Sequence, residues 1–356
     1  MILSSFSFKT QGWELKDFNA LQQTNLLVGK NASGKSRTIG ALQNVASFIC
    51  MKPTTLLGGL NFVTKLTFKN PDDDRWKLVY SFEIEKGIIK SERLYACNKK
   101  IILRDHENTF INGDSIDPPM DKLVTQVRRD RQEYPEVEYL MEWAEGIILI
   151  TCSNIIPFTL MGGSSSFLNP ISFSDLVASL NNEDKKRVIS NAKELGYYIK
   201  DISLIKATDE IKLVAVKEKY IKNSVVDLQL SSGMIRVLYT LCFLEYLKYD
   251  AKYSLLLIDD LGEGLDYKRA TLLVKTVFEA CERNGLQLIA SSNDSFMMDA
   301  VDISKWQILR RKKGKLAVFS QTNTPELFKS FRLTGLSNFD LFSSDYIETY
   351  LTQNNK

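Results

Sequence analysis

The chain has 356 residues, of which 44% are apolar and 25% charged, so it can form one large domain or two modest ones with a full core. Its net charge of +3 neither requires nor excludes a nucleic-acid partner. Five scattered cysteines without a C-x-x-C pair argue against a disulfide framework, and one histidine, His106, argues against zinc sites and histidine-dependent catalytic centres. We therefore expect a reduced, cytoplasmic protein in which carboxylates perform any proton chemistry.

The N-terminal residues alternate as a strand does, and no basic start followed by an apolar run suggests a secretory signal. Next comes LLVGKNASGKS, residues 26–36, in which Gly29, Gly34, Lys35 and Ser36 fit the pattern G-x-x-x-x-G-K-[ST]. In such a loop backbone N–H groups wrap phosphate oxygens, the lysine reaches the β- and γ-phosphates, and the serine hydroxyl ligates Mg²⁺. A helix that begins near Gly34 would direct its positive end at the same anion. The alternative is a simple glycine turn before a helix.

The remainder of the first half contains strands and then a more polar region. Strands are predicted at 76–85, 90–97 and 99–105. Residues 120–146 should be mostly helical, and their arginines (Arg128, Arg129 and Arg131) are interpreted as a solvated helix face rather than as phosphate contacts. The apolar stretch 146–161 is interrupted by Ser153, Asn154 and Pro157, so it indicates a buried strand and not a membrane span.

The middle of the chain should contain helices over 172–180 and 182–196, followed by a strand pair at 201–208 and 210–219. We find no internal repeat and no sustained heptad pattern, which argues against a long coiled-coil arm.

A second helix start of interest lies in QLSSGMIRVLYTLCFLEYL, residues 229–247. Ser231, Ser232 and Gly233 precede an almost wholly apolar helical run. The start of this helix could present the Ser231 hydroxyl and the Gly233 N–H to a γ-phosphate. A buried helix with a small polar turn at its start is the alternative.

Two apolar strands then end in polar residues. YSLLLIDDLGEGLD, residues 253–266, places Asp259 and Asp260 at the end of the first, and GLQLIASSNDSF, residues 285–296, ends the second with Ser291 to Asp294. Beside a phosphate-binding loop, one carboxylate can order metal-bound water while the other polarises the attacking water.

The order of these motifs resembles the ABC-type ATPase family, in particular the soluble heads related to SMC, RecF and OLD proteins and the stand-alone ATPases of bacterial phage-defence operons. The resemblance covers roughly residues 1–50 and 225–310. It implies that Leu230 to Met234 match the signature motif, usually LSGGQ, that Asp259 matches the Walker B aspartate, and that Gly264 to Asp266 match the D-loop. Two positions depart from the family at the hydrolytic centre: Asp260 replaces the usual glutamate and Asn293 replaces the switch histidine.

This resemblance implies ATP and Mg²⁺ as ligands, with Asp260 and Asn293 as catalytic residues and Ser36 and Asp259 as Mg²⁺ ligands. The predicted ATP contacts are Gly29, Asn31, Ala32, Ser33, Gly34, Lys35, Ser36, Arg37, Ser231 and Gly233. Gln126 and Gln132 are weak candidates for the Q-loop glutamine, which we do not assign.

The expected fold is an α/β P-loop NTPase of the ABC-ATPase type. It should have a mixed central sheet with flanking helices, an N-terminal antiparallel β subdomain and an inserted helical subdomain. We divide the chain into an N-terminal ATPase lobe (1–118), a helical insertion with returning strands (119–228), a C-terminal ATPase lobe (229–320) and a helical tail (321–356). The tail should pack on the core, with a partner-docking surface as the alternative, and the basic turn 310–315 is interpreted as a charged hairpin tip.

In the family geometry a signature motif cannot reach the phosphate of its own P-loop, so two chains would enclose each ATP between Lys35 of one and Ser231 of the other. We expect a slowly hydrolysing, homodimeric regulatory ATPase for a separately encoded effector in bacterial anti-phage defence, with no membrane partner. A RecF-like DNA-binding repair ATPase is the main alternative, so a nucleic-acid partner stays possible. A transporter subunit is the third hypothesis.

Overall fold

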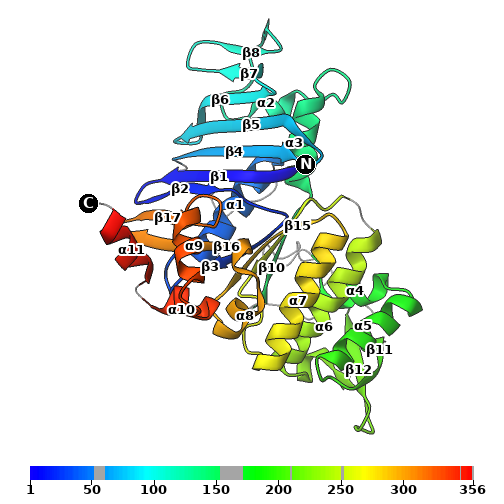
Figure 1. Cartoon of the computed structure of the whole chain (residues 1–356). Coiled ribbons are helices and arrows are strands. Elements are labelled where there is room, and N and C mark those ends of the chain that lie inside the picture. Colours follow the sequence, from blue (N-terminus) through cyan, green and yellow to red (C-terminus); the bar gives the residue numbers. More distant parts are fainter. Residues whose placement is uncertain (52–60, 153–170, 209–210, 250–251, 345, 355–356) are drawn as a thin grey trace.

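The computed structural model describes residues 1–51, 61–152, 171–208, 211–249, 252–344 and 346–354, and Figure 1 shows a long twisted sheet with helices on both faces. The sheet has 14 strands in the order β10-β14-β15-β3-β16-β17-β2-β1-β4-β5-β6-β7-β8-β9. The strands are β1 (Ile2–Thr10), β2 (Trp13–Asn19), β3 (Thr24–Val28), β4 (Phe62–Asn70), β5 (Asp73–Glu85), β6 (Ile88–Ala96), β7 (Lys99–Arg104), β8 (Thr109–Ile111), β9 (Asp114–Ser115), β10 (Ile147–Thr151), β14 (Leu255–Asp259), β15 (Gln287–Ser292), β16 (Trp306–Lys312) and β17 (Lys315–Phe319).

The two ends of this sheet differ in strand direction. From β10 to β16 every neighbouring pair is parallel, and β10, β14, β15 and β3 are short and largely buried. From β2 to β9 all pairs are antiparallel, and strands such as β4 alternate between buried and exposed residues. This pattern is expected, because a parallel sheet is buried on both faces whereas an antiparallel sheet can face water. The presence of both kinds of pairing confirms the mixed sheet predicted from the sequence.

Alternate residues of the parallel strands enter two different cores, because successive side chains in a strand point to opposite faces. Leu26 and Val28 of β3 belong to the core that contains α6 (Ser232–Tyr246) and α7 (Tyr267–Arg283). Leu27 belongs to the core that contains α1 (Lys35–Ile49) and α3 (Pro135–Glu145). The helices that follow the two glycine-containing motifs therefore pack on opposite faces of one sheet.

The inserted region packs beside α6. Helices α4 (Phe173–Ser179) and α5 (Asn182–Glu194) begin at the side-chain caps Ser172 and Asn181. The predicted strands pair with each other, as β11 (Ile199–Lys206) and β12 (Lys212–Glu218), and β13 (Val225–Val226) completes a separate three-stranded sheet. Of the apolar stretch 146–161, the part up to Thr151 forms the buried strand β10, and residues 153–161 lie outside the described residues.

Helix was predicted over most of 120–146, which is only partly right. The structure has the single turn α2 (Val124–Val127) and α3, with a turn between them. The Asp130 carboxylate accepts the N–H groups of Gln132 and Glu133 in that turn, a local bond that competes with helix formation. The arginines are therefore not on a helix face, but Arg129 forms ion pairs with Glu138 and Glu145 of α3.

The C-terminal tail packs on the core, as predicted. Its helices are α9 (Pro325–Arg332), α10 (Asn338–Ser343) and α11 (Tyr346–Asn354), and α8 (Ser295–Ala300) precedes them. Leu327, Phe328 and Phe331 of α9 are buried in the core of α6 and α7. In the described residues, no helix combines the length and apolar character that a bilayer crossing requires.

Candidate functional site

The loop between β3 and α1 places a glycine where a side chain would not fit. Gly34 has a φ of 107°, which L side chains rarely adopt, and a Cβ there would lie 2.9 Å from the Leu316 Cδ2 atom of β17. Gly34 is also the N-cap of α1 and offers no side chain to cap the helix. The first N–H groups of α1 consequently point into the loop without a partner from the helix itself.

These free N–H groups suit an anion. In the described part of the chain, backbone hydrogen bonds at this loop are limited to Ser33 N–H with the Lys30 carbonyl and Thr38 N–H with the Gly34 carbonyl. The N–H groups of Lys35, Ser36 and Arg37 belong to the first turn of α1, where a phosphate is stabilised by the helix dipole as well. Asn31, Ala32, Ser36 and Arg37 are exposed, so a ligand can reach the loop.

Lys35 is the buried cation of this loop, at 5% exposure. Its Nζ donates to the carbonyl of Gly29 at 2.6 Å and to that of Lys30 at 3.4 Å. Burial lowers the pKa of Lys35, and this effect outweighs the carboxylates of Asp260 and Asp259, which act to raise the pKa. The structure thus brings Lys35 and both acids at the end of β14 within electrostatic reach of one another.

Ser291 holds the two acids in place. Its hydroxyl donates to Asp259 Oδ1 at 2.6 Å and accepts the N–H of Asp260 at 2.9 Å. Asp260 has a φ of 55°, in the left-handed region that few residues other than glycine, asparagine and aspartate occupy. Of the two neighbouring carboxyl groups, that of Asp259 contacts Ser291 and that of Asp260 contacts Asn293.

Asp260 lies at the rim of a small cavity of about 270 Å³ that Glu263, Gly264 and Asn293 also line. Burial raises the pKa of the Asp260 carboxyl, Asp259 and Glu263 raise it further, and Lys35 and Arg236 act in the opposite direction. The Asn293 Nδ2 donates to Asp260 Oδ1 at 3.3 Å. The two predicted catalytic positions are thus in contact.

The start of α6 differs from that of α1. Ser231 is its N-cap, and the hydroxyl accepts the N–H of Met234 at 3.2 Å. A Cβ on Gly233 would lie 3.1 Å from Leu265, so the signature segment packs against the D-loop of the same chain. Because α6 and α1 are on opposite faces of the sheet, the structure does not bring Ser231 and Gly233 to Lys35.

Two residues around the site, Arg236 and Ser291, were not predicted as site residues. Arg236 of α6 donates through Nε to the Cys152 carbonyl at 2.7 Å and contacts the Glu263 carbonyl, so it ties α6 to the turn after β14. The guanidinium of Arg37, which was predicted as an ATP contact, lies 4.7 Å from the Trp13 ring centroid. Ser291 was noticed only as part of a polar strand end. Its position next to β14 in the sheet order is a tertiary feature, and the sequence carries no signal for it.

The Q-loop candidates receive no support. The Gln126 side chain donates to the Phe48 carbonyl at 2.6 Å and accepts the N–H of Leu123. Phe48 is near the C-terminal end of α1, about 20 Å along the helix from Lys35. Gln132 is in the exposed turn before α3.

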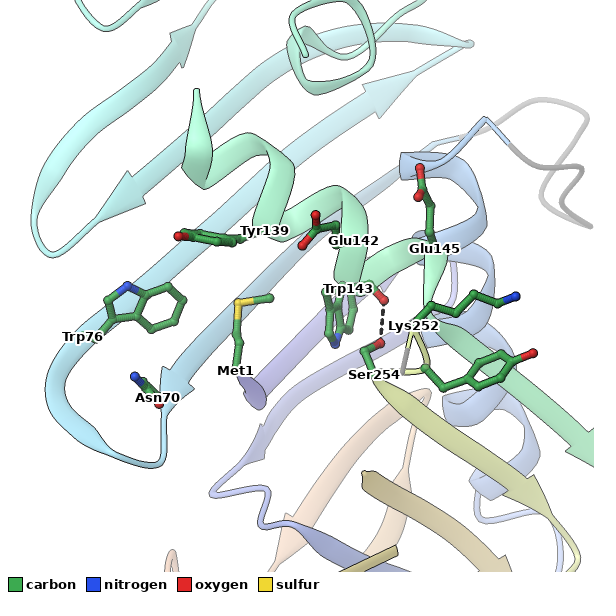
Figure 2. A pocket seen from close by; sticks show the side chains of 10 residues that line it. Met1, Asn70, Trp76, Tyr139, Glu142, Trp143, Glu145, Lys252 and Ser254 are labelled. Carbon is green, nitrogen blue, oxygen red and sulfur yellow. Dashed lines mark hydrogen bonds between the residues drawn. The ribbon is translucent and has the colours of Figure 1, made fainter. Parts of the chain in front are cut away.

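A larger cavity of about 680 Å³ lies elsewhere, between α3, the start of β1 and the β4–β5 turn (Figure 2). Trp76, Tyr139 and Trp143 line it, with the Met1 side chain between them, and the Ser254 hydroxyl donates to the Trp143 carbonyl at 2.7 Å. None of the predicted site residues lines this cavity.

Comparison with known proteins agrees with this geometry. The family model described as "AAA domain, putative AbiEii toxin, Type IV TA system" matches residues 162–299, the part with the signature segment and both acids. No curated protein matches the sequence.

Two solved structures are similar in fold. An SMC head bound to the C-winged helix domain of ScpA has a TM-score of 0.56 and 13% identity, over 91% of this chain and 100% of that chain. An SMC head with an extended coiled coil, bound to the C-terminal domain of ScpA derived from Pyrococcus furiosus, has a TM-score of 0.51 and 12% identity, over 93% and 99%. The chain therefore has a fold similar to that of SMC heads, and residues 162–299 are similar to the AAA-domain family.

Proposed function

We propose that the chain is an ATP-binding, slowly hydrolysing ATPase that closes as a homodimer around ATP and controls a separate effector. The observation that carries this proposal is the position of Lys35. Its buried ammonium group lies among the carbonyls of an open P-loop and within electrostatic reach of Asp259 and Asp260. A lysine in such a place is stabilised when phosphates and a metal ion occupy the space between it and the acids.

The residues present fit Mg²⁺–ATP. Lys35 and the free N–H groups of the P-loop and first turn of α1 would hold the phosphates, and Ser36 and Asp259 would hold the metal ion, which neutralises developing charge at the γ-phosphate. Asp260 would orient and deprotonate the attacking water, because burial and its acidic neighbours keep its carboxyl more basic than usual. Asn293, in contact with Asp260, would position that carboxyl without adding positive charge.

The two helix starts support the homodimer. Since α1 and α6 pack on opposite faces of the sheet, one chain does not enclose a nucleotide between them. A second chain, turned around a twofold axis, would present its Ser231 and Gly233 to the phosphate on Lys35. ATP would favour the closed pair through its higher affinity for that state.

The regulatory role rests on what surrounds this core. We propose that another protein performs the effector reaction. The description of the matched family names a putative toxin of a type IV TA system. This description favours a role for the chain in a bacterial defence module. The SMC heads with the same fold bind ScpA, and this supports a protein partner for the present chain.

Light scattering of the purified chain, combined with a phosphate-release assay, tests the proposal. We expect the mass to double with ATP and Mg²⁺, and to return to that of a monomer as phosphate is slowly released. A chain that binds ATP but stays monomeric at every concentration would refute the dimer. For the defence role, phage challenge of cells that carry the gene with its neighbours should show protection that the Lys35→Ala variant loses.

A further inference from the structure

A second cavity beside the P-loop, of about 1290 Å³, has a strongly positive lining. It lies between the outer side of the loop, the β16–β17 hairpin and α11, which Figure 1 shows next to β17. Seven of the residues that line it are lysine or arginine, and Glu348 of α11 is the one acid among them. Uncompensated cations around a concave surface raise the local concentration of anions.

The strand register places most of these cations on one face of the sheet. Lys312 of β16 pairs with Lys315 of β17, and Lys315 pairs with Glu14 of β2. Residues two apart in a strand share a face, so Arg310 and Lys16 lie on the same face as Lys312 and Lys315. Three adjacent strands thus present four cations on one face, together with the acid Glu14.

That face is not the one that carries α1. Leu309 of β16 and Leu316 of β17 belong to the core of α1, whereas Ile308 and Phe319 belong to the core of α6 and α7. Arg310, Lys312 and Lys315 alternate with the first pair and therefore project from the opposite face. These three cations therefore lie on the other face of the sheet from α1 and Lys35, and the cavity reaches the P-loop itself through Asn31, Ala32 and Ser33.

Donors without partners lie in the same cavity. The Arg310 side chain is 17% exposed, and one of its nitrogens forms an ion pair with Glu348 at 2.9 Å, but its Nε and Nη2 atoms are buried and unsatisfied. Ser33, 6% exposed, also has a buried hydroxyl with no partner. An unsatisfied buried donor costs about 1–3 kcal/mol, more when charged, which a bound acceptor would offset.

Most of the exposed lysines of the cavity also have no ion-pair partner among the described residues. Among the described residues, no carboxylate forms an ion pair with Lys30, Lys312 or Lys315. Lys16 has Glu14 at 3.5 Å. The cavity therefore keeps a large excess of positive charge after its internal pairs are counted.

We propose that this cavity, which we call the hairpin cavity, binds a compact oligophosphate anion separately from the P-loop nucleotide. Multiple phosphate oxygens match the spacing of several lysines and an arginine fork. The helix α11 bounds the cavity at Glu348 and Thr352, and a bounded cavity of this kind suits a short phosphate chain better than a nucleic-acid backbone, which needs an open track. The source can be free oligophosphate or the phosphate end of a second nucleotide.

Glu348 would compete with this ligand. It occupies one side of the Arg310 guanidinium, in the place of an anionic oxygen, and it belongs to the C-terminal helix α11. Binding at the hairpin cavity therefore loosens the contact between the tail and the hairpin. Removal of the Glu348 charge should strengthen oligophosphate binding a few-fold.

Calorimetric titration of the full chain with inorganic tripolyphosphate, at low salt and without Mg²⁺, tests the proposal. Lys16→Gln/Lys312→Gln/Lys315→Gln should weaken binding by at least about tenfold, since it removes three of the cations. The matched control is Lys69→Gln/Lys77→Gln, because these exposed lysines form a similar cross-strand pair on the β4–β5 hairpin. The control should bind as the parent does, and Lys35→Ala should retain tripolyphosphate binding.

Each other result overturns the proposal. Equal loss in the control pair would indicate nonspecific charge attraction. Loss in Lys35→Ala, or full displacement by one equivalent of ATP, would assign the anion to the P-loop. If a single-stranded oligonucleotide binds more tightly than tripolyphosphate through the same three lysines, the surface is a nucleic-acid interface. A competition titration between tripolyphosphate and a fluorescent ATP analogue distinguishes a failure of this proposal from a failure of ATP binding, because only the ATP analogue should require Lys35.

Discussion

Two helices of this chain, α1 and α6, each begin at a short segment of small polar residues. They differ in whether a side chain caps the N–H groups at the helix start. The start of α1 has a left-handed glycine and no side-chain cap, so its N–H groups are free. The start of α6 is capped by its own Ser231 hydroxyl. An open helix start binds an anion without losing a bond, whereas a capped one must exchange a bond it already has.

This difference suggests an order of events. The P-loop is ready for a phosphate in the single chain, with Lys35 already buried beside the acids. In the single chain, the Ser231 hydroxyl of the signature segment already accepts a hydrogen bond from its own helix. We therefore expect this segment to contribute to ATP binding only when a second chain approaches. We therefore expect ATP binding to precede association, and the following variants test the difference between the two helix starts.

The largest effect is expected from Lys35→Ala, which should lower ATP affinity by at least about 100-fold because it removes the charge that faces the phosphates. Titration with a fluorescent ATP analogue measures this. Lys30→Ala is the control: it removes an exposed lysine from the same loop and should leave affinity nearly unchanged. Equal affinity in Lys35→Ala and the parent would refute the P-loop assignment.

Asp260→Asn should lower the hydrolysis rate by about 10²–10⁴-fold and leave ATP binding intact, because the amide cannot accept the proton of the attacking water. Asp260→Glu should keep or raise the rate, since the longer side chain restores the reach of the family glutamate. Steady-state phosphate release of the three proteins compares them. Should Asp260→Asn hydrolyse as fast as the parent, Glu263, which lines the same cavity, becomes the next base to test.

Ser231→Arg should leave ATP binding by the single chain nearly unchanged and block ATP-dependent association. The physical reason is that the larger cation obstructs the surface that the second chain must approach. Size-exclusion chromatography with light scattering, with and without a non-hydrolysable ATP analogue, measures the mass. A variant that still doubles its mass with nucleotide would argue against the closed dimer.

The smallest effect concerns the cap itself. Ser231→Ala should reduce the free energy of unfolding by about 1 kcal/mol, because the Met234 N–H loses its acceptor. Asn181→Ala removes the cap of α5 and should cost a similar amount, but only Ser231→Ala should also weaken ATP-dependent association. Urea denaturation and light scattering of both variants separate a general loss of stability from a loss at the interface.

Much of the nucleotide core could be predicted from local patterns. The strand–loop–helix unit around Lys35, the buried strand before Asp259 and Asp260, and the apolar helix after Ser231 are short-range features. Their residue types follow from turn geometry and burial. The helix over 120–146 was overpredicted, because the Asp130 turn and the ion pairs of Arg129 with α3 satisfy that segment without helical hydrogen bonds.

Local sequence patterns indicated where the glycine loop, the two acids and the two helix starts lie, because strand burial, glycine conformation and helix starts are set by neighbouring residues. Only the tertiary structure decided how these segments meet. The sheet order places Ser291 beside Asp259, and strand alternation puts α1 and α6 on opposite faces. The pairing of β17 with both β16 and β2 gathers Lys16, Lys312 and Lys315 from distant parts of the chain. Such contacts depend on pairings between strands far apart in sequence, and no local pattern records them.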